Sequence, residues 1–319
     1  MKIDRTFPIL LIMMLTLVTA GCGNKRVNEQ RGARNAFYGQ LQTELDHIVS
    51  ECPGEIGIAV IVNGDADNQS DTIVVNNEDK YPMMSVFKLH QAIALSHEFD
   101  TEGISLDTVI CMHRDSLDPD TWSPMLKDHV ESEIRLPVRK LMEYTLQLSD
   151  NNASNEMFRQ LMPPADCDRY IATLIPRNSF KIKYSEAEMK RDHSLAYVNH
   201  TSPLGAAFLI NRLYTDSIMS SEKQSFLQET LSHCGTGVDR ISEPLQGISG
   251  IKIGHKTGSG YRNAHGELAA HNDVAFVRLP DGTRYSLAVV VKDFPGTEAE
   301  ASAIIARISQ AVYNSIQNY

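Results

Sequence analysis

Three Ser-x-x-Lys sequences occur in the chain, and each holds a hydroxyl and an amine at the same spacing. On a helix this spacing puts the two side chains on adjacent turns, where the lysine can accept the serine proton and activate a nucleophile that is otherwise weak. Ser85 and Lys88 follow a proline-bearing turn and begin an apolar helix, which suits this chemistry. Ser220 instead opens a polar helix as a cap, and Ser249 leads into a strand, where its lysine would not share a helical face. Ser85 is therefore the candidate nucleophile.

Two further polar clusters come later in the chain. The first follows an amphipathic helix over residues 141–148, and the second lies on a predicted strand. Taken singly, the first is typical of a helix terminus, because Ser, Asp and Asn cap helices well, and the second is typical of a strand edge. The two clusters are Ser149-Asp150-Asn151 and Lys256-Thr257-Gly258-Ser259.

The order of the three clusters resembles that of class A serine β-lactamases, which carry Ser-x-x-Lys, Ser-Asp-Asn and Lys-Thr-Gly in this order. The resemblance covers about residues 35–319. Residues 81–88 are similar to the extended-spectrum cephalosporinase branch of anaerobic Gram-negative bacteria. The resemblance implies a hydrolase that acts on a cyclic amide, with a small-molecule β-lactam as its partner.

The resemblance also assigns roles to the reactive groups. Ser85 would attack the lactam carbonyl and form an acyl-enzyme, while Lys88 would share the serine proton. Ser149, helped by Lys256, would pass a proton to the departing lactam nitrogen. The backbone amides of Ser85 and Ser259 would form the oxyanion hole, which stabilises the charge that develops on the carbonyl oxygen. The nearest alternative is a penicillin-binding D-alanyl-D-alanine peptidase, which has the same trio but releases β-lactams slowly.

Substrate-binding roles follow from the same resemblance. Asn151 would hold the side-chain amide of the substrate, and Thr257 and Ser259 would bind its carboxylate beside the lysine of the third cluster. Gly258 would let the substrate lie close to the backbone. Trp122 matches an aromatic residue at the cleft mouth, although the only tryptophan of the chain could also belong to the core.

Hydrolysis requires a carboxylate that deacylates the serine, and the loop between the second and third clusters offers two. Glu186 lies at the family's distance before the segment 201–203 that closes this loop, so we assign it this role. Glu188 is then expected to be a solvated loop charge. A carboxylate here can hold a water molecule against the acyl ester and accept its proton. This group favours a lactamase over the peptidase.

The same loop departs from the family pattern. Tyr184 stands where the family has an arginine and Asn199 where it has an aspartate, so the usual salt bridge across the loop is missing. Lys190 replaces the asparagine that usually shares the hydrolytic water. We expect an altered loop path and a wider pocket that admits bulky cephalosporins. The family's arginine beyond the third cluster has no obvious match, and Arg262 or His265 is the candidate for its role.

Hydrophobic periodicity predicts an α/β (α+β) fold, with an antiparallel sheet flanked by helices and an inserted all-helical lobe. The resemblance implies the β-lactamase/transpeptidase-like version of it. The expected helices span residues 37–48, 87–99, 138–148, 203–214 and 304–316. The expected strands span residues 56–62, 72–75, 250–255, 274–279 and 285–291.

Strands near both ends of the sequence imply a discontinuous α/β lobe made of residues 37–82 and 238–319. The helical lobe then spans residues 83–237. A cleft between two such lobes is a usual place for a site, so we expect the active site there.

The first 22 residues are typical of a secretory signal, because positive residues precede an apolar run over 8–20 that is too short for a membrane span of ~20 residues. Residues 17–22 resemble a lipoprotein cleavage box with Cys22 as the lipidated residue. The polar stretch 23–36 would then be a linker. We expect an exported, periplasmic enzyme with a membrane tether through Cys22; cleavage near Ala20 without lipidation is the alternative.

Composition excludes other classes. The formal net charge of −10 argues against nucleic-acid binding, which needs a basic face. The histidines form neither His-x-His-x-Asp nor His-Glu-x-x-His, so we expect no metal and no other cofactor. Nothing marks an oligomer interface, and we expect a monomer. Disulfides and free thiols both stay open for the remaining cysteines, which are Cys52, Cys111, Cys167 and Cys234.

Overall fold

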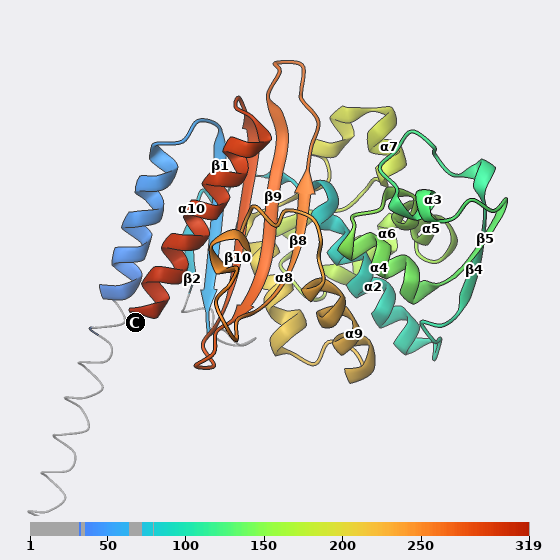
Figure 1. Cartoon of the computed structure of the whole chain (residues 1–319), viewed down its shortest axis with the longest axis horizontal. Coiled ribbons are helices and arrows are strands. Elements are labelled where there is room, and N and C mark those ends of the chain that lie inside the picture. Colours follow the sequence, from blue (N-terminus) through green and yellow to red (C-terminus); the bar gives the residue numbers. More distant parts are fainter. Residues whose placement is uncertain (1–31, 33–35, 64–71, 79, 319) are drawn as a thin grey trace, which may run out of the picture.

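The computed structural model describes residues 32, 36–63, 72–78 and 80–318. Five antiparallel strands form the main sheet, in the order β2-β1-β10-β9-β8 (Figure 1). Strands from both ends of the chain thus join in one sheet, which confirms the predicted fold class. The strands are β1 (Glu55–Val62), β2 (Thr72–Val75), β8 (Lys252–Ser259), β9 (Leu268–Arg278) and β10 (Arg284–Phe294).

Helices cover both faces of this sheet. Residues 36–50 are helical and lie beside α10 (Glu298–Gln317) on one face (Figure 1). On the other face α8 (Pro203–Thr215) packs against β1, β9 and β10. Side chains alternate along a strand. Ile58 of β1 therefore packs in the apolar cluster under α10, and Ala59 packs in the cluster on the other face, under α8. Burial on both faces explains why β1 is an almost continuous apolar run.

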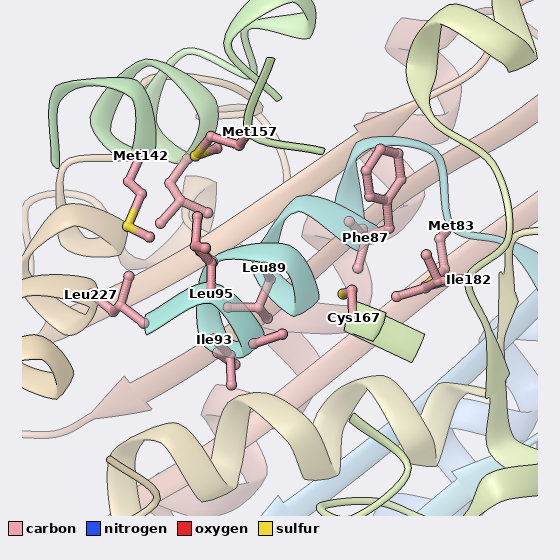
Figure 2. Close-up of a cluster of buried hydrophobic side chains, with 14 of the residues drawn as sticks. Met83, Phe87, Leu89, Ile93, Leu95, Met142, Met157, Cys167, Ile182 and Leu227 are labelled. Atoms are coloured by element: carbon pink, nitrogen blue, oxygen red, sulfur yellow. The ribbon is translucent and has the colours of Figure 1, made fainter. Parts of the chain in front are cut away.

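The helix α2 (Phe87–Thr101) is the centre of the second layer and is buried on nearly all sides. Figure 2 shows Leu95 of this helix among Met142, Met157 and Leu227, which come from three other helices. Its buried positions include Lys88, His90 and Gln91 beside the apolar side chains, so the core encloses this helix on most of its faces. The start of α2, which carries Lys88, is therefore held rigidly.

The region between β2 and β8 is mostly helical, as expected, and it also contains short strands that were not predicted from the sequence. Its remaining helices are α3 (Pro124–Asp128), α4 (Val138–Gln147), α5 (Asn151–Gln160), α6 (Pro164–Ile171), α7 (Glu186–Arg191) and α9 (Ser221–Ser232). Its strands are β3 (Tyr81–Pro82), β4 (Val109–His113), β5 (Glu133–Pro137), β6 (Phe180–Lys181) and β7 (His200–Thr201). Short 3₁₀ helices are η2 (Met84–Val86), η3 (Arg114–Ser116), η4 (Arg177–Ser179), η5 (His193–Tyr197) and η6 (Glu243–Leu245).

Several predictions about organisation remain predictions. The predicted signal over 1–22, with Cys22, lies outside the described residues, as does nearly all of the linker 23–36. Among the described residues no helix is long and apolar enough to cross a membrane. The boundaries of the two lobes are also untested. The cysteine question is answered for the described part of the chain, where all four are free thiols.

Candidate active site

Ser85 lies on η2, directly before α2, and the backbone next to it is strained. Met84 has a φ of 45°, a left-handed conformation that costs a non-glycine residue of order 1–3 kcal/mol. Hydrogen bonds from two elements hold it. The Met83 amide donates to the Asn199 carbonyl at 2.8 Å, and Asn272 Nδ2 of β9 donates to the Met83 carbonyl at 3.2 Å. The serine is therefore presented by a turn whose conformation the surrounding structure enforces.

The edge strand β8 lies directly against this turn because residue 258 is a glycine. A Cβ atom at Gly258 would stand 2.4 Å from the Met83 carbonyl oxygen and 3.2 Å from the Val86 amide nitrogen. The first distance is a steric overlap with backbone. We expected Gly258 to make room for the substrate, and the structure instead shows that it makes room for the turn that carries Ser85.

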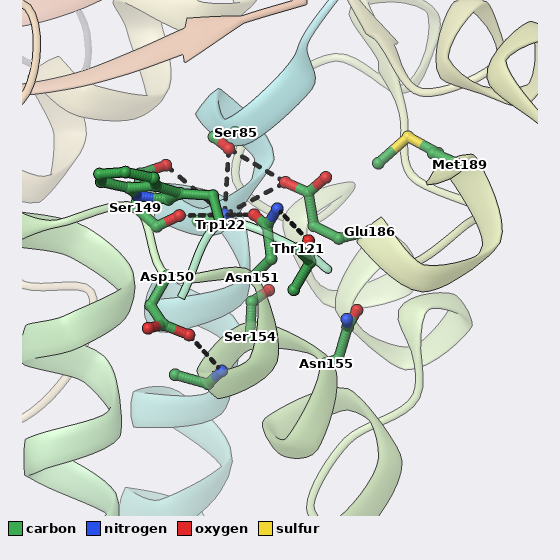
Figure 3. Close-up of polar contacts among 12 residues, drawn as sticks. Ser85, Thr121, Trp122, Ser149, Asp150, Asn151, Ser154, Asn155, Glu186 and Met189 are labelled. Carbon is green, nitrogen blue, oxygen red and sulfur yellow. Dashed lines mark hydrogen bonds and ion pairs between the residues drawn. The ribbon is translucent and has the colours of Figure 1, made fainter. Parts of the chain in front are cut away.

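Three predicted residues meet at the Ser85 hydroxyl (Figure 3). Ser85 Oγ donates to Glu186 Oε1 at 3.0 Å, and Lys88 Nζ donates to Ser85 Oγ at 3.0 Å. Lys88 and Glu186 also form an ion pair at 3.2 Å. A nucleophile with two basic groups within hydrogen-bond distance can be deprotonated in place.

Ser149 lies between α4 and α5 and is flanked by both lysines. Its φ of 57° is again left-handed, which turns the chain sharply between the two helices. Lys88 Nζ donates to the Ser149 carbonyl at 2.8 Å, and Lys256 Nζ donates to Ser149 Oγ at 3.1 Å. Asn151 Oδ1 accepts from Lys88 Nζ at 2.6 Å. The three motif clusters are thus joined by direct hydrogen bonds.

Asp150, the middle residue of the second cluster, has a structural task. Its side chain caps α5 by accepting from the Ala153 amide at 2.8 Å. It also accepts from the Met125 amide at 2.7 Å and from the Ser123 hydroxyl, so it ties α3 to α5. The Ser-Asp-Asn cluster is therefore both a helix cap and part of the site.

Burial sets the electrostatics of the two lysines. Both side chains are completely buried. Burial lowers the pKa of Lys88, and the charge of Glu186 opposes this effect. Burial also lowers the pKa of Lys256 to about 8. Each amine can therefore release its proton far more readily than a lysine in water.

The loop carboxylates divide as the sequence suggested, with one correction. Glu186 is the first residue of α7 and points toward Ser85 (Figure 3). Glu188 is not a solvated charge, because it forms a capping box with Ser185. Glu188 Oε2 accepts from the Ser185 amide at 2.8 Å, and the Ser185 hydroxyl accepts from the Glu188 amide at 3.3 Å. This box fixes the turn on which Glu186 stands.

Neutral hydrogen bonds take the place of the missing salt bridge. Asn199 Oδ1 accepts from the amides of Lys183 and Tyr184 at 2.9 and 3.0 Å, and Asn199 Nδ2 donates to the Tyr184 carbonyl at 2.7 Å. The loop is therefore tied at its base by a buried amide. Lys190 forms an ion pair with Asp118 at 2.6 Å, so its amine is engaged away from Ser85 and Glu186.

Two residues that the sequence did not suggest lie beside the third cluster. Thr236 Oγ1 is 2.6 Å from Thr257 Oγ1, and Arg240 donates to Ser259 Oγ at 2.6 Å. The Arg240 guanidinium also donates to the Asn272 carbonyl at 2.7 Å, and its side chain is buried. No sequence motif marks these residues, because they lie in the irregular segment between α9 and β8.

Arg240 corrects the expectation about the missing arginine. Arg262, in the β8–β9 connection, donates to the carbonyl of Gly266 in the same connection and to that of Gly296 after β10, and His265 is exposed beside it. Neither contacts Ser259. Arg240 precedes the third cluster in sequence, whereas both candidates, Arg262 and His265, follow it.

Trp122 lies at the rim of the site rather than in the core. Its side chain is 55% exposed, and its Nε1 donates to the Leu148 carbonyl at 2.8 Å, beside Ser149 (Figure 3). The neighbouring Thr121 hydroxyl accepts from Asn151 Nδ2 at 2.9 Å. An exposed aromatic ring at this position can cover an apolar part of a bound ligand.

No metal-binding group was found at the site within the described ranges. In the described part of the chain, one group of three potential metal ligands occurs, and it lies on the paired strands β4 and β5, away from the site (Figure 1). Its members are Cys111, His113 and Glu133. The site residues are a hydroxyl, two buried amines and a carboxylate. Such a set suits acyl transfer to serine followed by hydrolysis.

Comparisons with known proteins agree with this chemistry. The model of the β-lactamase enzyme family matches residues 40–316. A β-lactamase from Phocaeicola vulgatus is 57% identical over 274 residues, which cover 86% of this chain and 84% of the relative. The extended-spectrum β-lactamase PER-1 from Pseudomonas aeruginosa is 31% identical over 86% of each chain. A class A β-lactamase structure from Bacteroides cellulosilyticus superposes with a TM-score of 0.81 at 28% identity, covering 89% of this chain and 99% of that one. The chain therefore belongs to the β-lactamase enzyme family, and within it to class A.

Proposed function

We propose that Ser85 is the nucleophile of this serine β-lactamase and that Glu186 activates the water that releases the acyl group. One observation carries the proposal: the Ser85 hydroxyl lies 3.0 Å from both the Glu186 carboxylate and the Lys88 amine. A peptidase that only acylates needs no carboxylate at this place. The position of Glu186 therefore favours hydrolysis over the penicillin-binding alternative.

Acylation begins with removal of the serine proton. Burial lowers the pKa of Lys88 and so favours the neutral amine, which can accept the proton of Ser85. Attack on the lactam carbonyl places negative charge on its oxygen, and the backbone amides of Ser85 and Ser259 are the proposed oxyanion hole. Ser149 then gives its proton to the lactam nitrogen and receives the proton that Lys88 took from Ser85, since Lys88 Nζ lies 3.5 Å and Lys256 Nζ 3.1 Å from the Ser149 hydroxyl.

Deacylation reuses the same groups in another order. A water molecule placed between Glu186 and the acyl carbonyl gives its proton to the carboxylate and attacks the ester. The capping box of Ser185 and Glu188 keeps Glu186 at the start of α7, so its distance to Ser85 is fixed. The Ser85 oxygen leaves with the proton that Glu186 took from the water, which restores the starting protonation of Ser85, Lys88, Ser149 and Glu186.

The substrate is proposed to be a β-lactam with a carboxylate, with a preference for cephalosporins. Thr257 and Ser259 lie together at one end of β8, with the charge of Arg240 beside Ser259. Asn151, which follows Ser149 by two residues, and Trp122, which hydrogen-bonds the Leu148 carbonyl, would hold the side chain of the substrate. The extended-spectrum relative PER-1 and the loop tied by Asn199 support a pocket for bulky substrates.

Export and anchoring are proposed from the sequence. The apolar run over 8–20 and the cleavage box over 17–22 support removal of a signal and lipidation of Cys22. We propose a periplasmic monomer tethered by this lipid. Labelling with a radioactive fatty acid in cells should mark the wild type and not Cys22→Ala, and equal labelling would contradict the anchor.

Turnover of a chromogenic cephalosporin by the protein without residues 1–22 tests the catalytic roles. The wild type is expected to complete many turnovers, and Ser85→Ala none. Glu186→Gln should trap one acyl group on the serine, which mass spectrometry detects. A single stoichiometric burst by the wild type would mean that Glu186 does not deacylate.

Glu188→Gln is the matched control for Glu186→Gln. It removes a charge two residues away but keeps the capping box, since glutamine serves in that position as well as glutamate. We expect it to turn over the substrate like the wild type. An acyl-enzyme trapped by Glu188→Gln instead would exchange the roles of the two carboxylates.

A further inference from the structure

A buried polar cluster lies beside the third motif, and none of the steps above uses it. Asp273 of β9 accepts from His255 Nδ1 at 3.0 Å and from the Ile241 amide at 3.1 Å. His255 in turn interacts with Cys234, which lies just after α9, and this interaction lowers the pKa of the Cys234 thiol. All three side chains are buried, with exposed fractions of 9% or less. A cysteine, a histidine and an aspartate are thus linked in series inside the protein.

The cluster reaches the substrate-binding end of β8. His255 and Thr257 are two residues apart on β8 and so share one face of the strand, where Asp273 pairs directly with Thr257. Cys234 Sγ is 3.4 Å from Thr236 Oγ1, which is 2.6 Å from Thr257 Oγ1. A chain of polar contacts therefore runs from Asp273 to the hydroxyl that is proposed to bind the substrate carboxylate.

Each hydroxyl in this chain has a single proton, so the direction of donation matters. If Cys234 donates to Thr236, the Thr236 proton can point to Thr257. The Thr257 proton is then available to a ligand. If Cys234 only accepts, the Thr236 proton points back to the sulfur and the Thr257 proton is drawn toward Thr236. The ligand then loses a donor.

We propose that Cys234 is a positioning residue: its thiol form leaves the Thr257 proton to the substrate carboxylate, and its thiolate form withdraws it. This inference rests on the proposed role of Thr257 in binding that carboxylate. It concerns binding alone and involves no bond to the sulfur. Loss of the thiol proton is expected to weaken substrate binding and to leave acyl transfer at Ser85 unchanged.

The charges around the sulfur place this change near neutral pH. His255 and Lys256 face Cys234 from β8, Asp273 lies behind His255 on β9, and Arg240 comes from the following segment. Burial would raise the pKa of Cys234, but the hydrogen bond from His255 and the positive charges of His255 and Lys256 lower it to about 7. Burial would also lower the pKa of His255, and Asp273 raises it well above its usual value. The donating thiol is therefore present below about pH 7 and is lost above it.

KM and kcat measured against pH test the inference, with protein purified after expression of the full chain. The substrates are a cephalosporin and its carboxylate methyl ester. For the wild type and the free carboxylate, KM should rise about fivefold across pH 7, which is the loss of one hydrogen bond worth about 1 kcal/mol. Cys234→Ser cannot ionise, and its KM should change less than about twofold, the size of a weak surface effect. The kcat profile should be the same in both proteins.

Cys111→Ser is the matched control, because this thiol lies on β4 and not at the site. It should keep the wild-type rise in KM. An equal rise in Cys234→Ser, or an equal rise with the methyl ester, would overturn the inference. Cys234→Ala repeats the measurement should the serine variant fail to fold. Mass spectrometry of the acyl group on wild-type Ser85 tells the two failures apart. If no acyl group forms, the proposed function is refuted; if it forms and the KM profiles of the wild type and Cys234→Ser are the same, only the role of Cys234 is refuted.

Discussion

Replacing Arg240 by alanine is the sharpest test of how the enzyme binds a substrate carboxylate. The guanidinium is buried, with 6% of the residue exposed, and it donates to Ser259 Oγ at 2.6 Å and to the Asn272 carbonyl at 2.7 Å. Its Nε has no hydrogen-bond partner in the described part of the chain. A buried positive charge with an unused donor beside a hydroxyl is a good partner for an anion.

The magnitude follows from these contacts. A hydrogen bond to a charged group contributes ~1.5–3 kcal/mol, so Arg240→Ala should raise KM about 10- to 100-fold. The carboxylate does not react, and its interaction is equal in the ground state and the transition state, so kcat should change little. The variant also leaves the Asn272 carbonyl without this donor, and a buried unsatisfied group costs ~1–3 kcal/mol of stability. Tm should therefore fall as well.

The assay compares KM for a cephalosporin and for its carboxylate methyl ester in three proteins. Arg240→Ala should lose binding of the free carboxylate and keep binding of the ester. Arg262→Ala removes an arginine that contacts only the carbonyls of Gly266 and Gly296, and it should behave like the wild type. Equal loss for both substrates, or loss in Arg262→Ala alone, would refute the reasoning.

Three further predictions concern the nucleophile turn, the loop and the second lysine. Gly258→Ala should lower both Tm and activity, because its Cβ would overlap the Met83 carbonyl at 2.4 Å, and unchanged values would contradict this packing. Asn199→Asp should lower the free energy of unfolding by ~1–3 kcal/mol, because the carboxylate would face the Tyr184 carbonyl. Urea denaturation measures this change, and an unchanged free energy of unfolding would show that the Asn199 amide does not stabilise the loop. For Lys256, kcat/KM should fall as pH rises through about 8, where the amine loses its proton, and Lys256→Arg should shift the fall to higher pH. A fall at the same pH in both proteins would exclude Lys256 as its cause.

The strands and long helices could be predicted from the sequence because their apolar periodicity reports which face is buried. Ile58 and Ala59 of β1 illustrate this, since each packs into a different apolar cluster. The β4–β5 pair was not predicted, because its two short strands lie within a region whose other signals are helical. For the site, the three motifs named the groups that the structure brings together. They could not name Arg240 or Thr236, whose positions depend on the path of an irregular segment.

Glu188 and Gly258 show a different limit of sequence reasoning. Glu188 was expected to be a solvated loop charge and Gly258 to give the substrate room, whereas in the structure Glu188 caps α7 and Gly258 lets β8 approach the Ser85 turn. A residue type that suits a chemical role often suits a packing role equally well. Only distances decide between them.

Assembly of the site depends on closure of the sheet from both ends of the chain. Ser85 follows β3, whereas β8 and β9 come from residues more than 150 positions later. Asn272 joins these parts, because its Nδ2 donates to the Pro82 carbonyl at 2.8 Å while its Oδ1 accepts from the Val291 amide at 3.1 Å. The left-handed backbone at Met84 is held by Asn272 of β9 and by the Asn199 carbonyl, which both come from later parts of the chain. The nucleophile therefore reaches its reactive geometry only when these parts are in place, and a chain that has not closed its sheet is expected to be unable to acylate.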